Sequence, residues 1–142
     1  MKMESVLAVK GPGVVTMEHG ATLAEAVALL VEHGIGAIVV LNGATEPIGI
    51  ISERDIVREA SRSSDFPTLL VRDVMTKDVI FGSCDDDVEA VLQTMTSHHF
   101  RHVPIVEDGK LVGIVSIGDL VKAQLDRYRG DIDTLETQLM NA

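Results

Sequence analysis

The sequence contains an internal duplication. The heptapeptide Gly-Ile-Ile-Ser-Glu-Arg-Asp at residues 49–55 returns as Gly-Ile-Val-Ser-Ile-Gly-Asp at residues 113–119. Residues 22–41 align with residues 87–106 at a spacing of 65, which falls to 64 at the heptapeptides because a turn has lost one residue. Such a repeat predicts two similar halves that pack on one another. Because each copy keeps a serine and an aspartate at matching places, the repeat suggests two related concave sites. Such a pair is more typical of ligand binding than of a single reaction.

Length and composition allow one compact domain or two small halves. With 142 residues, 46% of them hydrophobic and 24% charged, the chain has enough apolar surface to fold alone. Its formal net charge of −10 argues against nucleic acid as a partner, because binding a phosphate backbone usually requires a basic surface. Apolar runs such as residues 37–41 have the length of strands, so no membrane partner is expected. A single cysteine, Cys84, and the absence of a signal-peptide pattern in residues 1–10 predict a cytoplasmic protein.

Each half is predicted to contain the elements β-α-β-β-α. Apolar residues recur at helical spacing after Thr22 and after the aspartates at residues 85–87, which are suitable N-caps. Apolar runs separated by turn residues predict the strands, and Ser52 and Ser116 begin a second helix in each half. The strands are expected at residues 14–17, 37–41 and 47–51, and at residues 78–81, 103–106 and 111–115.

The boundary between the halves is expected near residue 70. Residues 61–67 are rich in Ser, Asp and Pro and are typical of a linker, and residues 68–75 are expected to add one short helical turn. We therefore assign residues 1–67 to the first repeat, with its core at about 14–60, and residues 68–123 to the second repeat.

A long helix is predicted at residues 116–140. Apolar residues there follow one another at intervals of 4 and 3, the spacing of a coiled-coil seam: Val121, Leu125, Tyr128, Ile132, Leu135 and Leu139. Gly130 lies within this stretch and costs on the order of 1 kcal/mol relative to alanine, so the helix needs a partner surface. That surface is either the body of the same chain or the same helix of another copy. We favour the second, a homodimer.

A serine and an aspartate stand three residues apart at matching places in the two halves. They are Ser52 with Asp55 and Ser116 with Asp119, each at a predicted junction of strand and helix. A carboxylate can accept both hydroxyls of a ribose, and a helix N-terminus with its serine can receive phosphate oxygens. The same spacing is also a capping box, which needs no ligand. Both interpretations stay open at this point.

The order of these motifs resembles that of a tandem pair of cystathionine-β-synthase-type (CBS) domains, the arrangement called a Bateman module. The likeness rests on the stretch at residues 32–37, on its counterpart at residues 98–104, and on the two heptapeptides. It implies a mixed α/β (α+β) fold of two βαββα units with pseudo-twofold symmetry, to which the sequence adds the long C-terminal helix. It also implies two clefts that commonly hold adenine nucleotides or related adenosyl ligands.

The resemblance assigns Asp55 and Asp119 to the ribose of such a ligand. Basic residues are distributed unequally, since Arg54 corresponds to Gly118 while the pair Arg101-His102 corresponds to Gly36-Ala37. The residues expected to bind phosphate are Ser52, Arg54, Ser116, Arg101 and His102.

We expect these groups to form two different clefts. Arg101 and His102 would act with Ser116 and Asp119, and Arg54 would act with the serine and aspartate of the first half. Few aromatic residues are present, so adenine is expected among β-strand residues and nearby backbone groups, at Val15, Ala37, Ile50, Ile80, Val103, Pro104 and Ile114.

The sequence therefore predicts a non-enzymatic sensor that binds AMP, ADP, ATP, NAD(H) or S-adenosylmethionine and signals to a separate target protein. No nucleophile elbow, phosphate loop or dinucleotide-binding motif is present, so a nucleotide-acting enzyme is a remote alternative. No catalytic cofactor is expected, and the histidines lack the spacing of a metal site. A ligand-free adaptor for protein–protein interaction is the other alternative.

Overall fold

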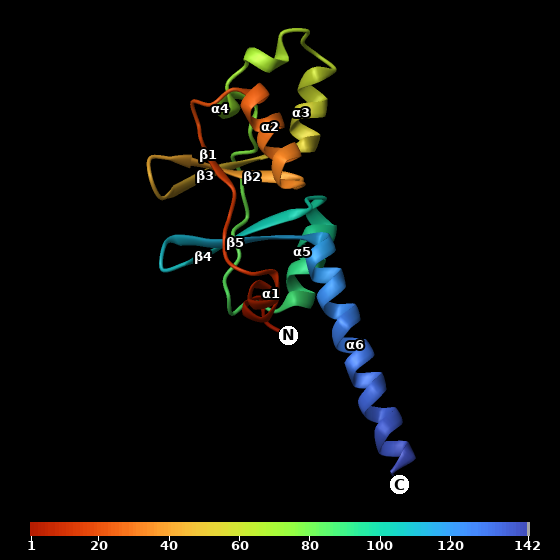
Figure 1. The fold of residues 1–142 in the computed structure, drawn as a ribbon. Helices are drawn as coiled ribbons and strands as arrows, with labels where there is room; N and C mark the ends of the chain where they lie inside the picture. Colours follow the sequence, from red (N-terminus) through yellow and green to blue (C-terminus); the bar gives the residue numbers. More distant parts are fainter. Residues whose placement is uncertain (142) are drawn as a thin grey trace.

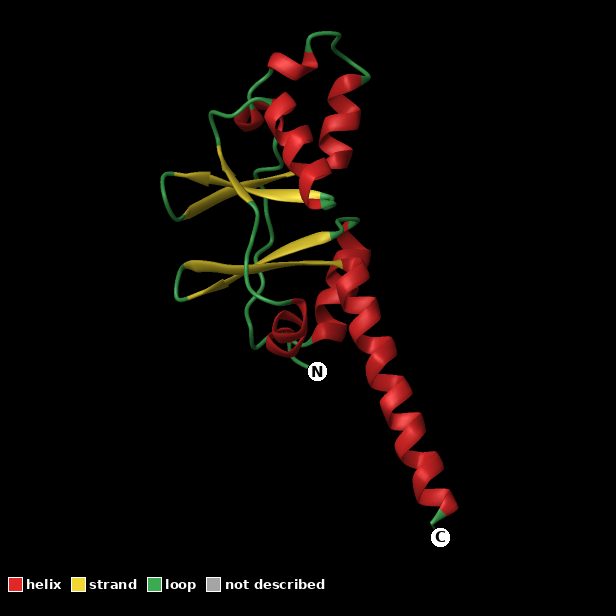
Figure 2. Ribbon diagram, viewed as in Figure 1, coloured by secondary structure: helices red, strands yellow, loops and turns green. Residues whose placement is uncertain are grey.

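The computed structural model describes residues 1–141, which form two stacked α/β halves and a long helix that leaves one end (Figure 1). The strands of both halves lie in the middle of the molecule and the helices lie outside them (Figure 2). Strands β3 and β5, one from each half, contact each other across the middle. The mixed α/β fold with a duplicated unit and a long C-terminal helix is thus confirmed.

The first half has the predicted order of elements. They are β1 (Thr16–Glu18), α2 (Leu23–His33), β2 (Ala37–Asn42), β3 (Glu46–Ser52) and α3 (Glu53–Ala60). Strand β2 pairs in parallel with β1 and antiparallel with β3. Thr22 caps α2 in a capping box with Glu25, and Gly34 ends the helix in the left-handed conformation at φ 61°.

The second half lacks the first of its predicted strands. It contains α5 (Val88–His98), β4 (His102–Glu107), β5 (Lys110–Ser116) and α6 (Ile117–Met140). The strand expected at residues 78–81 is wrong, because this segment crosses between the halves and first reaches β4 at Gly82. There the Gly82 N–H donates to the Pro104 carbonyl at 2.8 Å, and the bridge to Ile105 stays isolated.

A helix that the sequence analysis did not predict, α1 (Met3–Lys10), completes the core of the second half. Met3 is fully buried and packs there with Val88 and Val103. In the first half the equivalent position belongs to α4 (Val71–Val74), which follows a short 3-10 helix, η1 (Phe66–Thr68). Helix α1, within residues 1–67, therefore packs in the core of the second half, and α4, within residues 68–123, packs in the core of the first half. That division into repeats stays a prediction.

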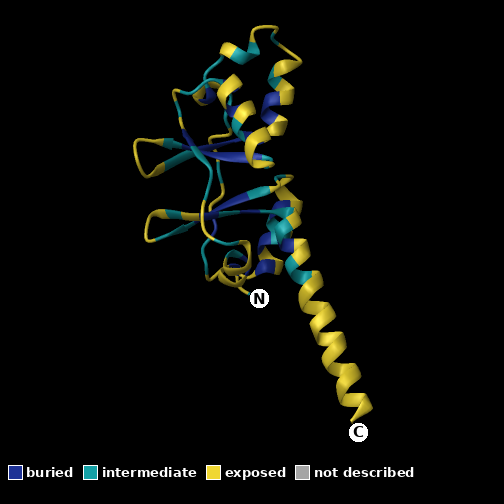
Figure 3. Cartoon of the chain, in the orientation of Figure 1, coloured by how far each residue is buried: buried dark blue, intermediate teal, exposed yellow. Residues whose placement is uncertain are grey.

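Helix α6 extends beyond the body of the molecule. Its first turn is anchored by Leu120, which is fully buried in the second core. The predicted apolar stripe is half-exposed at Val121 (45%) and rises to 77% exposed at Leu139. Figure 3 shows the helix exposed along its outer length. The stripe therefore does not pack on the body of its own chain, which removes one of the two predicted partner surfaces.

Candidate functional site

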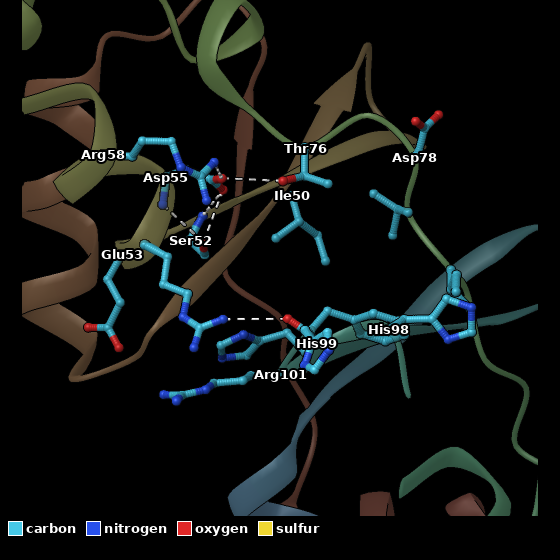
Figure 4. A pocket seen from close by; sticks show the side chains of 15 residues that line it. Ile50, Ser52, Glu53, Asp55, Arg58, Thr76, Asp78, His98, His99 and Arg101 are labelled. Carbon is cyan, nitrogen blue, oxygen red and sulfur yellow. Dashed lines mark hydrogen bonds and ion pairs between the residues drawn. The ribbon is translucent and has the colours of Figure 1, made fainter. Parts of the chain in front are cut away.

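A cavity of about 400 Å³ lies between the two halves, beside the N-terminus of α3 (Figure 4). This volume is within the range typical of small-molecule sites, about 300–1,000 Å³. Seven residues predicted for ligand binding line it: Ile50, Ser52, Arg54, Asp55, Ile80, Arg101 and His102. Eight further lining residues were not predicted: Glu53, Arg58, Thr76, Asp78, Val79, His98, His99 and Phe100.

The carboxylate of Asp55 is buried in the wall of this cavity and accepts three hydrogen bonds. Its Oδ2 accepts from the backbone N–H of Ser52 at 2.9 Å and from the Ser52 hydroxyl at 3.0 Å. Its Oδ1 accepts from the Thr76 hydroxyl at 3.3 Å and lies 3.7 Å from Nη1 of Arg58. The capping-box interpretation is therefore confirmed, and the same carboxylate faces the cavity (Figure 4).

Three guanidinium groups give the cavity a cationic side. Arg54 and Arg58 come from α3, and Arg101 comes from the segment before β4. The planar fork of arginine matches the oxygens of a phosphate group. Nη1 of Arg54 also donates to the backbone carbonyl of His99 at 3.4 Å, so this side chain connects the two halves across the cavity.

His102 lies at the same edge of the cavity. Burial lowers the pKa of its imidazole, and the nearby carboxylate of Glu53 opposes this effect without cancelling it. A neutral imidazole can donate one hydrogen bond and accept another.

The structure brings predicted basic residues from both halves to one cavity. Arg101 and His102 line the cavity of Asp55, and His102 also lies opposite Ser116 in the pairing of β4 with β5. Their predicted action with Asp119 on a ligand stays a prediction. The halves face each other, so the first residues of β4 in the second half lie opposite the start of α3 in the first half. Sequence spacing within one half could not indicate this, because the contact joins different halves.

The second aspartate has a different environment. Oδ2 of Asp119 accepts from the Ser116 N–H at 2.9 Å, as in a capping box, and from Nζ of Lys10 at 2.8 Å. The same lysine ammonium donates to the carbonyl of Ile114 at 2.6 Å. Burial alone would raise the pKa of Asp119, but the hydrogen bonds from Lys10 and Ser116 outweigh it and lower the pKa.

Five predicted adenine contacts are not among the lining residues of the cavity. Ala37, Val103 and Pro104 are buried, while Val15, just before β1, and Ile114, in β5, are partly buried. Of the residues that sequence reasoning missed, Arg58 follows Asp55 by three positions on a helix, a spacing that could have suggested it. Thr76 and Asp78 lie between regular elements, and Asp78 begins the segment that was wrongly predicted as a strand.

The single cysteine, Cys84, does not line the cavity. Hydrogen bonding to Glu107, together with burial and nearby carboxylates, raises the pKa of the Cys84 thiol to about 11, so its nucleophilic thiolate form is scarce near neutral pH. Within residues 1–141, no group of three or more His, Cys, Asp or Glu side chains is arranged to hold a metal ion. No helix in this part of the chain is long and apolar enough to cross a membrane.

The chain is similar to several known proteins. An uncharacterized 17.7 kDa protein of Acidianus ambivalens is 44% identical over 115 residues, which cover 80% of this chain and 68% of that protein. Two further curated relatives are longer, and the chain spans 64% and 60% of their lengths. The crystal structure of the CBS-domain containing protein ATU1752 from Agrobacterium tumefaciens shares 36% identity with a TM-score of 0.84, over 87% of this chain and 99% of that one.

A more distant structure has the same fold. The CBS domain pair of protein MJ0100, solved in complex with 5′-methylthioadenosine and S-adenosyl-L-methionine, is 23% identical with a TM-score of 0.79, over 89% of this chain and 98% of that chain. Residues 9–62 and 71–126 each match the family model of the CBS domain. Because these two matches cover most of the chain and coincide with its internal duplication, this protein belongs to the CBS-domain family and contains two CBS repeats.

Proposed function

We propose that this chain is a non-catalytic regulatory module that binds an adenosine-containing ligand beside Asp55 and signals its occupancy to a separate target protein. The observation that carries this proposal is the cavity between the halves, which brings a carboxylate, three arginines and apolar side chains to one place. Each of these groups suits a different part of a nucleotide.

The carboxylate of Asp55 suits the ribose. Its oxygens already accept hydrogen bonds from Ser52 and Thr76, and a carboxylate has about four lone-pair sites in total. Ribose hydroxyls can therefore be added as donors or exchanged for the weak 3.3 Å bond from Thr76. A buried acceptor of this kind forms charge-assisted hydrogen bonds, which are about twice as strong as neutral ones.

Adenine and phosphate would lie on opposite sides of the ribose. Ile50, Val79, Ile80 and Phe100 supply an apolar wall for the base. The arginines supply cations for phosphate oxygens. The arginines favour ligands that carry phosphate, such as AMP, ADP, ATP or NAD(H), over S-adenosylmethionine, which has no phosphate group. The two adenosyl ligands in the complex of the MJ0100 domain pair support binding of this class of ligand by the fold.

The bond between Arg54 and the His99 carbonyl suggests how occupancy is transmitted. A phosphate group would compete with this carbonyl for the guanidinium and would loosen one connection between the halves. A ligand that binds one spacing of the halves more tightly shifts the population toward that spacing, by no more than its difference in affinity. The target protein would then recognise the altered surface.

The proposal is tested by calorimetric titration of the purified chain with AMP, ATP, NAD and S-adenosylmethionine. We expect saturable binding of at least one phosphate-bearing ligand, with S-adenosylmethionine the weaker. Mass spectrometry of small molecules released from the denatured protein would identify a ligand that was retained during purification. Binding of none of the four, with no retained ligand, would contradict the proposal and favour the ligand-free adaptor.

We also propose that α6 pairs with α6 of a second copy to form a homodimer. Its stripe from Val121 to Leu139 stays exposed in the single chain, and its spacing is that of a coiled-coil seam. Truncation after Ala123 should convert the dimer to a monomer in sedimentation equilibrium. An undisturbed dimer would place the interface elsewhere.

A further inference from the structure

The N-terminal helix places a lysine on the second copy of the ligand-binding motif. This second half-site consists of Ser116, Asp119 and the carbonyl of Ile114. We propose that Lys10 fills this half-site, so that each chain binds one adenosyl ligand instead of two. The inference rests on the function proposed above and concerns the half-site that this function leaves unused.

Helices α1 and α4 hold equivalent places in the two halves. The N–H of Val71, the first residue of α4, donates to the Ala21 carbonyl at 2.8 Å, just before α2. The N–H of Met3, the first residue of α1, donates to the Asp86 carbonyl at 2.9 Å, just before α5. The two helices differ in length, since α4 ends at Val74 while α1 continues for another turn.

Because α1 is longer than α4, a different side chain contacts the aspartate in each half. After α4 the chain is extended, and the Thr76 N–H donates to the carbonyl of Ile50 at 2.8 Å while its hydroxyl donates to Asp55 at 3.3 Å. The extra turn of α1 brings Lys10 to the same pair of acceptors in the second half. Its ammonium donates to the carbonyl of Ile114 at 2.6 Å and to Asp119 at 2.8 Å.

Thr76 and Lys10 differ in how much of the neighbouring aspartate they leave free for a ligand. A threonine side chain is short and neutral, and the cavity beside Asp55 stays open in its presence. Lysine has a four-carbon stem and a full positive charge. Its ionic hydrogen bond of 2.8 Å occupies the carboxylate that a ribose would need. A ligand would have to displace this side chain.

Apart from Lys10, the second half-site has no arginine at the positions that match Arg54 and Arg101. Arg101 of the second half corresponds to Gly36 of the first, and Arg54 of the first corresponds to Gly118 of the second. A Cβ atom at Gly36 would lie 3.2 Å from Oε1 of Glu53 and 3.3 Å from Nε2 of His102, so a longer side chain has little room there. Without Lys10, this half-site would therefore accept an uncharged nucleoside in preference to a nucleotide.

The test is a count of binding sites in the full-length chain. Wild-type protein and Lys10→Met are titrated with AMP and with the phosphate-free probe 5′-methylthioadenosine. We expect one equivalent of 5′-methylthioadenosine per wild-type chain and two per Lys10→Met chain, with one equivalent of AMP in both. Lys10→Arg keeps the cation and should stay at one equivalent. Lys2→Met removes an exposed cation at the start of α1 and should also stay at one. Lys10→Gln provides the same readout if the methionine variant does not fold.

The outcomes separate this inference from the proposed function. One equivalent in wild type and in Lys10→Met overturns the inference and leaves the proposed function intact, and two equivalents in wild type do the same. Binding to Lys10→Met but not to wild type supports the inference and contradicts the proposed site at Asp55. Binding to neither protein overturns both.

Discussion

The two halves of this protein present the same Ser-x-x-Asp motif in two different environments. Both aspartates close a capping box at the start of a helix. Asp55 is nearly inaccessible (side chain 7% exposed), accepts a hydrogen bond from Thr76, lies 3.7 Å from Nη1 of Arg58 and lines an open cavity. Asp119 is 30% exposed and forms an ion pair with Lys10. The motif thus sets the position of the carboxylate, while residues far away in the sequence, such as Thr76 and Lys10, determine which groups contact it.

Substitution by alanine should destabilise the protein more at Gly49 than at Gly113, the glycines that begin the two heptapeptides. A Cβ atom at Gly49 would lie 2.6 Å from Sδ of Met75 and 2.9 Å from the backbone carbonyl of Thr76. At Gly113 the nearest atom would be a terminal methyl carbon of Leu7 at 2.5 Å. A leucine methyl can rotate away, whereas the Thr76 carbonyl is fixed by its bridge to Ile50.

We therefore expect Gly49→Ala to lower the free energy of unfolding by about 2–3 kcal/mol, and Gly113→Ala by about 1 kcal/mol. Urea denaturation of the two variants beside wild type measures both losses. Equal losses would show that α1 and the segment after α4 are equally rigid, contrary to the difference in their contacts.

A smaller effect concerns the pH dependence of stability. Burial lowers the pKa of His102 in the folded state, so the unfolded chain binds a proton first as the pH falls below about 6.5. The stability that the neutral imidazole contributes is therefore fully present above that pH and is lost as the pH falls toward the folded-state pKa.

Between pH 7.5 and pH 5.5 we expect wild type to lose about 0.5 kcal/mol more stability than His102→Gln, after allowance for solvent screening. Denaturant unfolding at the two pH values measures this difference. His33→Gln, which changes an exposed histidine in α2, is the matched control. A wild-type slope in His102→Gln would mean that this imidazole does not titrate differently in the folded state.

The sequence predicted the elements whose signals are local. The apolar periodicity of α2, the turn residues of both hairpins and the serine caps at Ser52 and Ser116 each lie within a few positions of the structure they specify. Helix α1 was missed because its core-facing residues, Met3, Val6 and Leu7, span little more than one turn, too short to show a period.

The candidate site was predictable only in part, for the same reason. Asp55 and Arg54 stand in a motif and Ile80 was predicted as a lining residue, but Thr76, Asp78 and Val79, which lie in the same segment, were not. The pairing of Lys10 with Asp119 joins residues 109 positions apart, and nothing in the sequence near either residue indicates the other. Both the cavity between the halves and the pair of Lys10 with Asp119 are formed by tertiary packing, which local sequence patterns do not indicate.

The central claim is that one of the two aspartates holds the ligand. Calorimetric titration of AMP into Asp55→Asn and Asp119→Asn tests it most directly, because the two substitutions remove the same charge from the same motif. We predict that Asp55→Asn weakens binding about 10- to 100-fold, as expected for loss of a hydrogen bond to a charged group, while Asp119→Asn changes the affinity less than about 2-fold. Wild-type affinity in Asp55→Asn, with both variants folded, would contradict the account.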